Sequence, residues 1–491
     1  MTTTADALST TSTEQLDEQI RAARTAYERA TEVPPRRRAE WLEAIASALE
    51  EHAGELVPLA QQETHLATGR LQGELKRTVF QLRFFADEIV RGEHFAATID
   101  HEDPSWGMGP RPDIRRVNEP LGVVGVFGAS NFPFAFSVIG GDSASALAAG
   151  CAVVHKIHDG HYALAVRTGQ IVTEALRAAG APTSLFSTVT GRDAAQALVD
   201  HPLVRAIGFT GSPTGGRALF DRACRRPVPI PFYGELGSVN PVFVTEKAWT
   251  TRRDEILAGY ANASTMGMGQ FCTKPGLLFV PAFDDDEVTD VLRRELGTKP
   301  LTALLTPNLR EAFDTALASV RALPQVDELI SGDDAEAPRP TVLITTSEAV
   351  REDTTVLERE IFGPATVIVQ YRSEGELAEL ASLLDGQLTA TLQAEPDEQL
   401  TGLVGVLRDK SGRVLWNSWP TGVTVSYAQH HGGPYPATTA PATTSVGTAS
   451  IGRFMRPVAY QSFPEGQLPP ALREANPWAI ARRVDGHRTQ N

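Results

Sequence analysis

Hydrophobic residues in the first hundred positions recur every three or four residues, which is the spacing of one face of an α-helix. Three such runs predict amphipathic helices over residues 16–27, 41–49 and 75–89. Residues 11–14, Thr-Ser-Thr-Glu, offer a capping box before the first run, and Pro34-Pro35 precedes the second. We expect the apolar stripe of each helix to pack into a core.

From about residue 120 the pattern changes to short apolar runs that alternate with helical stretches. The apolar runs are rich in β-branched residues and are bounded by turn formers, which is typical of buried strands. The sequence predicts strands at 121–128, 151–154, 185–189 and 206–209, and helices at 143–149, 162–179 and 193–199. This alternation indicates an α/β fold with a parallel sheet, and a ligand of such a sheet lies at the carboxyl ends of its strands.

A second α/β stretch runs from about residue 234 to 430, with strand candidates at 277–280 and 366–369. The tail from residue 452 onward is rich in proline and arginine, and we expect it to be irregular. A chain of 491 residues corresponds to about three domains.

The charge balance narrows the class of partner. Lys and Arg total 45 against 60 Asp and Glu, which gives a formal charge of −15. Nucleic acids and anionic membranes do not attract such a chain, so we expect neither as a partner. No apolar run reaches the ~18 residues of a membrane span, and the N-terminus lacks the basic and apolar regions of a secretory signal. We therefore expect a cytoplasmic protein.

The chain has three cysteines, at positions 151, 224 and 272, too few for a disulfide framework. We expect all three to be reduced thiols. No Cys-x-x-Cys or His-x-x-x-His pair supplies the ligand spacing of zinc, so we expect no metal site.

The strongest local signal for chemistry is residues 267–273, Gly-Met-Gly-Gln-Phe-Cys-Thr. A cysteine among glycines suits a thiol that a substrate can reach, and the thiolate of Cys272 would be the nucleophile. A buried, inert thiol is the alternative on local grounds.

Glu235 and Asn131 are further candidates. Glu235 follows Phe232-Tyr233-Gly234, an apolar setting that would raise its pKa and suit a general base, although a capping carboxylate fits the same pattern. Asn131 follows the strand that ends at Gly128, where its amide could donate to an oxyanion or form an Asx turn before Pro133.

A glycine-rich turn at residues 209–217, Phe-Thr-Gly-Ser-Pro-Thr-Gly-Gly-Arg, lies between a predicted strand and a helix. Such turns receive phosphate on free N–H groups, although neither standard glycine fingerprint for nucleotides is present and a plain tight turn is the alternative.

Taken together, the motifs resemble those of aldehyde dehydrogenases over about residues 15 to 465. They occur in the order of that family: Asn131-Phe132-Pro133, Lys156, the Phe-Thr-Gly-Ser turn, Glu235-Leu236-Gly237, Gly269-Gln270-Phe271-Cys272 and Glu360-Ile361-Phe362-Gly363-Pro364. Four segments are similar to the branch of 2-oxoglutarate semialdehyde dehydrogenases and NADP-dependent fatty aldehyde dehydrogenases: residues 140–147, 231–237, 271–276 and 431–438.

The resemblance implies a three-part fold. A Rossmann-type cofactor domain would comprise residues 1–99 and 118–233, and an α/β catalytic domain would span 234–452. Residues 100–117, with a strand at 113–117, and residues 453–491 would form an oligomerisation arm and C-terminal tail. Family members are dimers and tetramers, so the resemblance implies a homo-oligomer, with a dimer preferred.

The resemblance also implies NAD(P)-dependent oxidation of an aldehyde to a carboxylic acid. Cys272 would form a thiohemiacetal whose oxyanion is held by Asn131 and the Cys272 N–H. After hydride transfer, Glu235 would activate water to hydrolyse the thioester. The implied substrate is 2-oxoglutarate semialdehyde or an aliphatic aldehyde, with Phe134 and His431 near it; His431 would relay a proton, contact substrate or only brace its loop. Redox-independent thiol acyl transfer or ester hydrolysis is the remaining alternative.

The cofactor residues follow from the same resemblance. Lys156 would bind the adenosine ribose or its 2′-phosphate, the turn residues Gly211, Ser212 and Gly216 would lie beside the pyrophosphate, and Glu360 and Phe362 would contact the nicotinamide end. Two further residues favour different cofactors. Arg192 suits the 2′-phosphate of NADP, whereas the carboxylate of Asp159 suits the ribose hydroxyls of NAD. NADP is preferred over NAD here.

Overall fold

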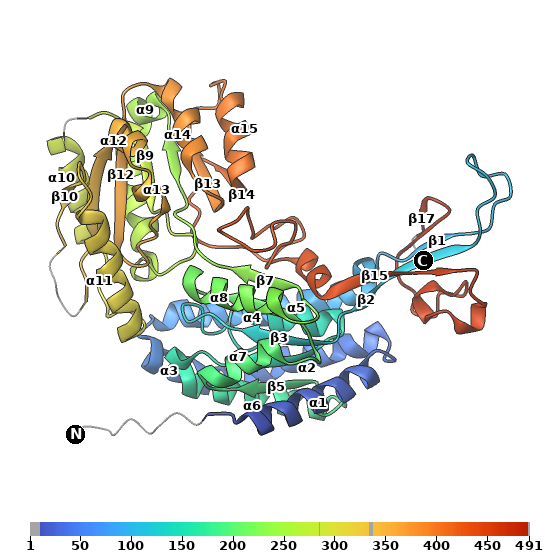
Figure 1. Ribbon diagram of the computed structural model, residues 1–491. Helices are drawn as coiled ribbons and strands as arrows, with labels where there is room; N and C mark the ends of the chain where they lie inside the picture. Colours follow the sequence, from blue (N-terminus) through green and yellow to red (C-terminus); the bar gives the residue numbers. More distant parts are fainter. Residues whose placement is uncertain (1–9, 284, 333–336, 490–491) are drawn as a thin grey trace, which may run out of the picture.

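The computed structural model describes residues 10–283, 285–332 and 337–489. Figure 1 shows two α/β bodies, each built on its own sheet, and an arm that projects to one side. The strands of the arm come from both ends of the sequence: the chain enters the arm after α4, returns to the first body, and enters the arm again with its last strands.

The first body contains a five-stranded sheet of order β5-β4-β3-β6-β7 in which every neighbouring pair is parallel. Its strands are β3 (Val123–Phe127), β4 (Ala152–Lys156), β5 (Phe186–Val189), β6 (Val204–Thr210) and β7 (Phe232–Glu235). The connecting helices are α5 (Gly141–Ala149), α6 (Tyr162–Ala178), α7 (Arg192–Asp200) and α8 (Pro213–Arg225). The predicted alternation of strands and helices is confirmed, and all five residues of β3 are buried as expected for a central strand.

Four N-terminal helices pack against this body: α1 (Thr13–Ala30), α2 (Pro35–Glu51), α3 (Ala53–Thr64) and α4 (Thr68–Arg91). A capping box begins α1, one residue later than the predicted box of residues 11–14, with Ser12 as N-cap and Gln15 as its partner. Helix α3 was not predicted, because Pro58 interrupts its pattern. The apolar stripes of the other three helices are buried, as expected.

The second body contains a seven-stranded sheet of order β10-β11-β12-β9-β8-β13-β14, which is parallel except for β10. Its strands are β8 (Val242–Val244), β9 (Leu277–Pro281), β10 (Asp327–Ile330), β11 (Thr341–Thr346), β12 (Ala365–Tyr371), β13 (Gln387–Gln393) and β14 (Ser411–Trp416). Its helices are α9 (Glu246–Thr265), α10 (Asp285–Gly297), α11 (Pro307–Arg321), α12 (Ser347–Glu352), α13 (Thr355–Glu358), α14 (Leu377–Leu383) and α15 (Thr401–Lys410). The strands predicted at 277–280 and 366–369 are β9 and β12.

The arm is a third sheet, of order β15-β2-β1-β16-β17. Its strands are β1 (Thr98–Asp100), β2 (Ile114–Pro120), β15 (Met455–Gln461), β16 (Arg482–Val484) and β17 (His487–Thr489). The expectation of an irregular tail from residue 452 was therefore wrong. β15 is ordered by antiparallel pairing with β2, more than three hundred residues earlier, and Pro457 is tolerated because β15 is an edge strand.

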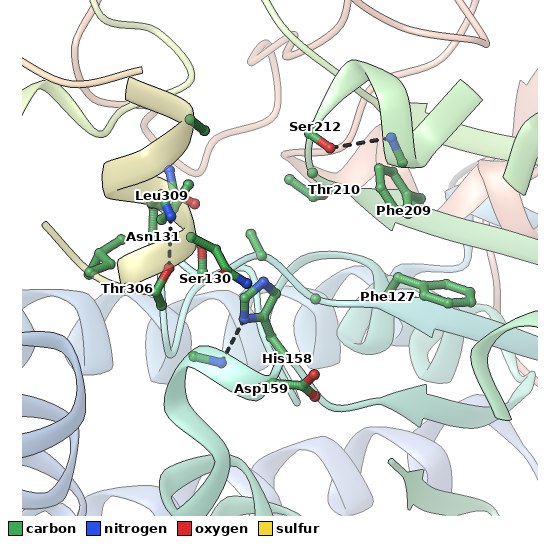
Figure 2. A pocket seen from close by; sticks show the side chains of 18 of the residues that line it. Phe127, Ser130, Asn131, His158, Asp159, Phe209, Thr210, Ser212, Thr306 and Leu309 are labelled. Carbon is green, nitrogen blue, oxygen red and sulfur yellow. Dashed lines mark hydrogen bonds between the residues drawn. The ribbon is translucent and has the colours of Figure 1, made fainter. Parts of the chain in front are cut away.

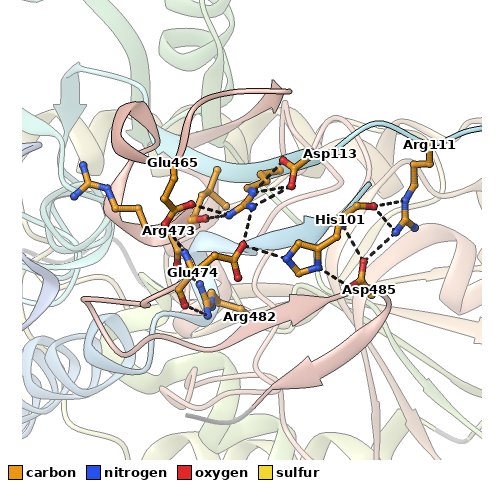
Figure 3. A network of polar contacts seen from close by, with 10 residues as sticks. His101, Arg111, Asp113, Glu465, Arg473, Glu474, Arg482 and Asp485 are labelled. Carbon is orange, nitrogen blue, oxygen red and sulfur yellow. Dashed lines mark hydrogen bonds and ion pairs between the residues drawn. The ribbon is translucent and has the colours of Figure 1, made fainter. Parts of the chain in front are cut away.

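A network of ion pairs ties the two ends of the chain together in the arm (Figure 3). His101 contacts Asp485 at 2.7 Å and Glu474 at 3.1 Å, and Arg115 contacts Glu474 at 2.6 Å. Such a network stabilises the arm mainly by joining several charges at once, since isolated surface pairs contribute little.

Short 3₁₀ segments complete the fold: η1 (Glu93–Phe95), η2 (Asp159–His161), η3 (Met266–Gly269), η4 (Glu374–Glu376), η5 (Thr448–Phe454), η6 (Glu465–Gln467) and η7 (Pro470–Leu472). Among the described residues, no helix combines the length and the apolar character that crossing a membrane requires.

Candidate active site

A cavity of about 1290 Å³ opens at the carboxyl ends of the strands in the first sheet. Figure 2 shows side chains that line it, drawn from the loops after β3, β4 and β6 and from the start of α11. The predicted site residues among its lining are Asn131, Lys156, Asp159, Arg192, Gly211, Ser212, Glu235, Cys272, Glu360 and Phe362. The cavity thus lies at the edge of the sheet where a ligand was expected.

A tight turn and an asparagine amide fix the position of Cys272. Gly267, Met268 and Gly269 all have positive φ angles, and a Cβ on Gly269 would lie 2.1 Å from the carbonyl oxygen of Gly363. Only glycine fits there, because the turn presses against the backbone before β12. After the turn, Nδ2 of Asn240 donates to the Cys272 carbonyl at 2.8 Å, which leaves the thiol partly exposed at the cavity.

Glu235 ends β7 and faces the thiol. Its Oε1 lies 2.9 Å from Nε2 of His431, and its Oε2 accepts a hydrogen bond from Ser445 Oγ at 3.2 Å. Nε2 of His431 is also 3.7 Å from Sγ of Cys272. A carboxylate oxygen of Glu235, Sγ of Cys272 and a ring nitrogen of His431 all lie within 4.8 Å of one another. The nucleophile, the carboxylate and the imidazole are therefore in one cluster.

The charges of this cluster set its protonation. Burial acts to raise the pKa of Glu235, but the neighbouring His431 outweighs burial, and the net pKa of Glu235 is lowered from its usual value. Burial, followed by the negative charge of Glu235, raises the pKa of the Cys272 thiol well above its ordinary value. The resting cluster therefore holds an ionised Glu235 beside a protonated thiol. The sequence-based expectation of a raised pKa for Glu235 was wrong, because nothing local predicted His431 as its partner.

Asn131 lies on the loop after β3, close to the cysteine turn. Its Nδ2 donates to the carbonyl of Gln270 at 3.0 Å, and its own carbonyl accepts from Arg70 Nη2 at 2.6 Å. The amide is 7% exposed and lies beside the nucleophile, so it is within the same small region as the reacting groups.

Lys156, Asp159 and Arg192 also line the cavity. Lys156 Nζ pairs with Asp159 Oδ1 at 3.1 Å, and the two side chains are 15% and 59% exposed. Arg192 begins α7 and lines the same cavity. Lys156 is thus already paired with a carboxylate of the chain, and Arg192 lines the cavity that contains this pair.

The glycine-rich turn leads into the N-terminus of α8. Ser212 is the N-cap, and its Oγ accepts from the Gly215 N–H at 3.3 Å (Figure 2). Gly216 lies behind the turn, where a Cβ would come within 2.2 Å of Leu236 Cδ2. The first N–H groups of a thirteen-residue helix therefore face the cavity, an arrangement that attracts anions.

Lys274 is buried near the partly buried Glu360, and their charges interact. Burial raises the pKa of Glu360 to about 7 and lowers the pKa of Lys274 to about 8. Lys274 Nζ donates to the carbonyls of Ile361, Gly363 (3.1 Å) and Ala365 (2.7 Å). Lys274 therefore holds the segment that carries Glu360 and Phe362.

Phe134 is not brought to the cavity. It is 3% exposed and belongs to the core of the first body, with its N–H bound to Glu74 Oε1 at 2.8 Å. Phe136, two residues on, instead has its ring 6.4 Å from that of His431. Phenylalanines stand at every second position of this loop, at 132, 134 and 136, and the sequence does not show which of their rings faces a ligand.

Several residues at the site were not predicted as functional. Ser445 and Asn240 act through single hydrogen bonds from segments distant in sequence, and no local pattern identifies them. Arg70 also escaped notice, although its guanidinium lies 5.1 Å from the Phe132 ring centroid and 4.7 Å from that of Phe271.

Comparison with known proteins gives close relatives over nearly the whole chain. Alpha-ketoglutaric semialdehyde dehydrogenase 2 of Azospirillum brasilense is 42% identical over 473 residues, covering 94% of this chain and 90% of the relative. Alpha-ketoglutaric semialdehyde dehydrogenase of Acinetobacter baylyi is 40% identical over 489 residues, covering 97% and 92%.

Solved structures share the fold at low sequence identity. Glyceraldehyde-3-phosphate dehydrogenase GapN of Methanocaldococcus jannaschii, complexed with NADP, aligns with a TM-score of 0.78 at 19% identity, covering 92% of this chain and 95% of that one. Gamma-glutamyl-gamma-aminobutyraldehyde dehydrogenase of Burkholderia cenocepacia aligns with a TM-score of 0.77 at 20% identity, covering 91% and 88%. Residues 2–434 match the model of the aldehyde dehydrogenase family, and this chain belongs to that family.

Proposed function

We propose that this NAD(P)-dependent aldehyde dehydrogenase oxidises 2-oxoglutarate semialdehyde to 2-oxoglutarate, with NADP preferred. The observation that carries the reaction class is the contact of Cys272, His431 and Glu235 at the inner end of the cavity. The substrate rests on the two relatives of 42% and 40% identity, whose names specify this aldehyde.

Activation of the thiol is the first step. Cys272 donates its proton to Glu235, with which it is hydrogen-bonded, and the positive edge of His431 at 3.7 Å stabilises the resulting thiolate. Because the thiol pKa is raised, the thiolate forms only in small amounts before the aldehyde arrives. The new C–S bond then removes the buried negative charge from sulfur and places it on the substrate oxygen.

The oxyanion of that thiohemiacetal needs donors. Nδ2 of Asn131, which now donates to Gln270, turns toward the new oxygen, and the N–H of Cys272 supplies the second hydrogen bond. Each such donor contributes about 3 kcal/mol to stabilising the charged intermediate. NAD(P) held in the cavity would supply the acceptor for the hydride that leaves this carbon, and Cys272 would then carry a thioester.

Glu235 completes the reaction after it has released its first proton to solvent. As a carboxylate it takes a proton from water, whose oxygen attacks the thioester carbon and releases the acid and the Cys272 thiol. His431 and Ser445 hold Glu235 in position and keep it ionised. Overall, aldehyde, water and oxidised cofactor give the carboxylate, reduced cofactor and two protons.

The cavity fits a dinucleotide in several respects. It is about 1290 Å³, the N-terminus of α8 lines it and attracts the negative charge of a pyrophosphate through the helix dipole, and Glu360, Phe362 and Cys272 line it as well. Gly216 allows α8 to pack closely behind this turn. Lys156 and Arg192 would bind the 2′-phosphate of NADP, which supports the preference for NADP, while the Asp159 carboxylate opposes it.

We further propose a homodimer or homotetramer assembled through the arm. The proposed cofactor domain is 1–99 with 118–233, the catalytic domain is 234–452, and the arm is 100–117 with 453–491. The projection of the arm sheet away from both bodies supports this division (Figure 1). Light scattering after size-exclusion chromatography measures the assembly, and a monomeric mass would refute it.

The proposed function is tested by mixing the protein with NADP or NAD and a panel of aldehydes and recording reduced nicotinamide. 2-Oxoglutarate semialdehyde should give the highest kcat/KM, ahead of medium-chain aliphatic aldehydes. A higher kcat/KM for the aliphatic aldehydes would overturn the proposed substrate.

A further inference from the structure

Two arginines from distant parts of the chain meet at one loop near Cys272. Arg77 lies on α4, and its Nε and Nη2 donate to the carbonyl of Val423 at 3.2 Å each. Arg413 lies on β14, and its Nη1 and Nη2 donate to the carbonyls of Gly422 at 3.2 Å and Pro420 at 2.7 Å. The loop 420–423 therefore brings both guanidinium groups to neighbouring carbonyls.

Neutral carbonyls leave the charges of these arginines largely uncompensated. Within the described residues, Nη1 of Arg77 and Nε of Arg413 are buried and have no hydrogen-bond partner. Glu74 attracts Arg77 but also attracts Arg70, and its Oε1 is occupied by the N–H groups of Phe134 and Ala135. One carboxylate thus serves two arginines, and the titratable group that interacts with Arg413 is the Cys272 thiol, which is neutral at rest.

Both guanidinium groups lie near the reacting end of the site. Each is close enough to Cys272 for their charges to interact, and Arg413 acts to lower the pKa of the thiol. The Arg77 guanidinium lies 5.0 Å from the ring centroid of Phe136, whose ring is 6.4 Å from that of His431. A Cβ on Gly422 would meet no heavy atom within 4 Å, so the loop between the arginines borders open space.

We propose that Arg77 and Arg413 bind the carboxylate of the substrate while its aldehyde carbon lies at Cys272, and that they thereby select short oxo acids over uncharged aldehydes. This inference rests on the proposed function and assigns its specificity to two residues. Arginine suits the task because its planar guanidinium donates two parallel hydrogen bonds to a carboxylate. The methylene chain of a fatty aldehyde would instead desolvate both cations without giving them a partner.

The test compares 2-oxoglutarate semialdehyde with pentanal, an uncharged aldehyde of equal carbon number, in the Arg77→Met and Arg413→Met variants. For the anionic aldehyde, KM should rise and kcat/KM should fall by roughly 10- to 100-fold in each variant, because a hydrogen bond to a charged group is lost. For pentanal, kcat/KM should fall much less than for the anionic aldehyde, because only the effect of the arginines on the Cys272 thiol is lost. Arg408→Met, which removes an exposed arginine of α15, is the control and should change neither value.

Binding of glutarate, a dicarboxylate without an aldehyde, gives a readout that needs no turnover. Its affinity by isothermal titration calorimetry should fall in both variants and stay unchanged in Arg408→Met. Unchanged glutarate affinity, or equal losses for the semialdehyde and pentanal, would overturn the inference, because a structural role of the arginines affects both aldehydes alike.

The inference stays testable if a variant fails to fold or if the enzyme prefers another oxo acid. Should the methionine variants fail to fold, Arg77→Lys and Arg413→Lys keep the charge; a rise in KM for the anionic aldehyde alone supports the inference, and equal changes for both aldehydes refute it. Should wild type prefer another oxo acid, such as succinic semialdehyde, the proposed substrate fails. The role of the arginines is then judged by the same variants with that acid.

Discussion

Nε2 of His431 lies 2.9 Å from Oε1 of Glu235, and the two side chains are 1% and 6% exposed. A carboxylate so deeply buried would ordinarily favour its neutral form. The imidazole reverses that preference, since it is the main influence that lowers the Glu235 pKa. In the proposed mechanism the pairing keeps Glu235 available as a base for two successive proton transfers.

Replacing His431 by glutamine should move the acid limb of the kcat profile to higher pH. Glu235 must be ionised to accept a proton from water, and its pKa rises once its interaction with His431 is lost. A higher pKa means that a larger part of the enzyme is protonated and inactive at a given acidic pH. Because the wild-type Glu235 pKa is lowered from its usual value, steady-state rates must extend down to about pH 3 to measure the shift. An acid limb that stays in place would show that His431 does not control Glu235.

Replacing Glu235 by glutamine should make the Cys272 thiol more reactive toward iodoacetamide at neutral pH. The negative charge of Glu235 is, after burial, the main cause of the raised thiol pKa, so its removal lowers that pKa and increases the thiolate fraction. Alkylation rates measured across a pH series should rise at a lower pH than in wild type. The Cys272→Ala variant corrects for Cys151 and the exposed Cys224. Slower alkylation in Glu235→Gln would contradict this electrostatic account.

Replacing Lys274 by methionine should destabilise the protein by about 3 kcal/mol, because three carbonyls of the segment 361–365 lose their buried donor. Urea denaturation measures the change. Lys247→Met is the matched control: Lys247 is half-exposed and pairs with Asp397, so its loss should cost less than about 1 kcal/mol. Equal effects of the two substitutions would show that Lys274 does not anchor this segment.

Replacing Asp159 by serine should increase the preference for NADP over NAD by roughly tenfold. The substitution frees Lys156 from its carboxylate partner at 3.1 Å and removes a charge that repels a 2′-phosphate. Ratios of kcat/KM for the two cofactors measure the preference. Arg192→Ala should shift the ratio in the opposite direction, and an increased NADP preference in that variant would argue against its proposed role.

Local pattern predicted much of the first body and part of the site. The apolar runs that end at Gly128, Lys156 and Phe209 are the strands β3, β4 and β6, and parallel strands bring their carboxyl ends to one edge. Asn131, Lys156 and Ser212 follow directly from those ends, so the geometry of the sheet places them together at the cavity.

Contacts between distant segments were beyond such reasoning. Arg77 and Arg413 are separated by more than three hundred residues and share only the loop 420–423, so no spacing in the sequence relates them. The ordered strand β15 likewise depends on β2, and its partly exposed, proline-containing pattern gives little signal on its own. These features arise from tertiary pairing, which a local pattern does not encode.

The most direct test of the mechanism is to trap the intermediate that joins substrate to enzyme. The Glu235→Gln variant, mixed with 2-oxoglutarate semialdehyde and NADP, should release one equivalent of reduced cofactor per active site and then stop. Its thiol has a lower pKa than in wild type and loses its proton to solvent, whereas its thioester lacks a base to activate water. Mass spectrometry of the digested protein should then find the acyl group on the peptide that contains Cys272. A burst with no acyl group on Cys272, or continued turnover in this variant, would contradict the account.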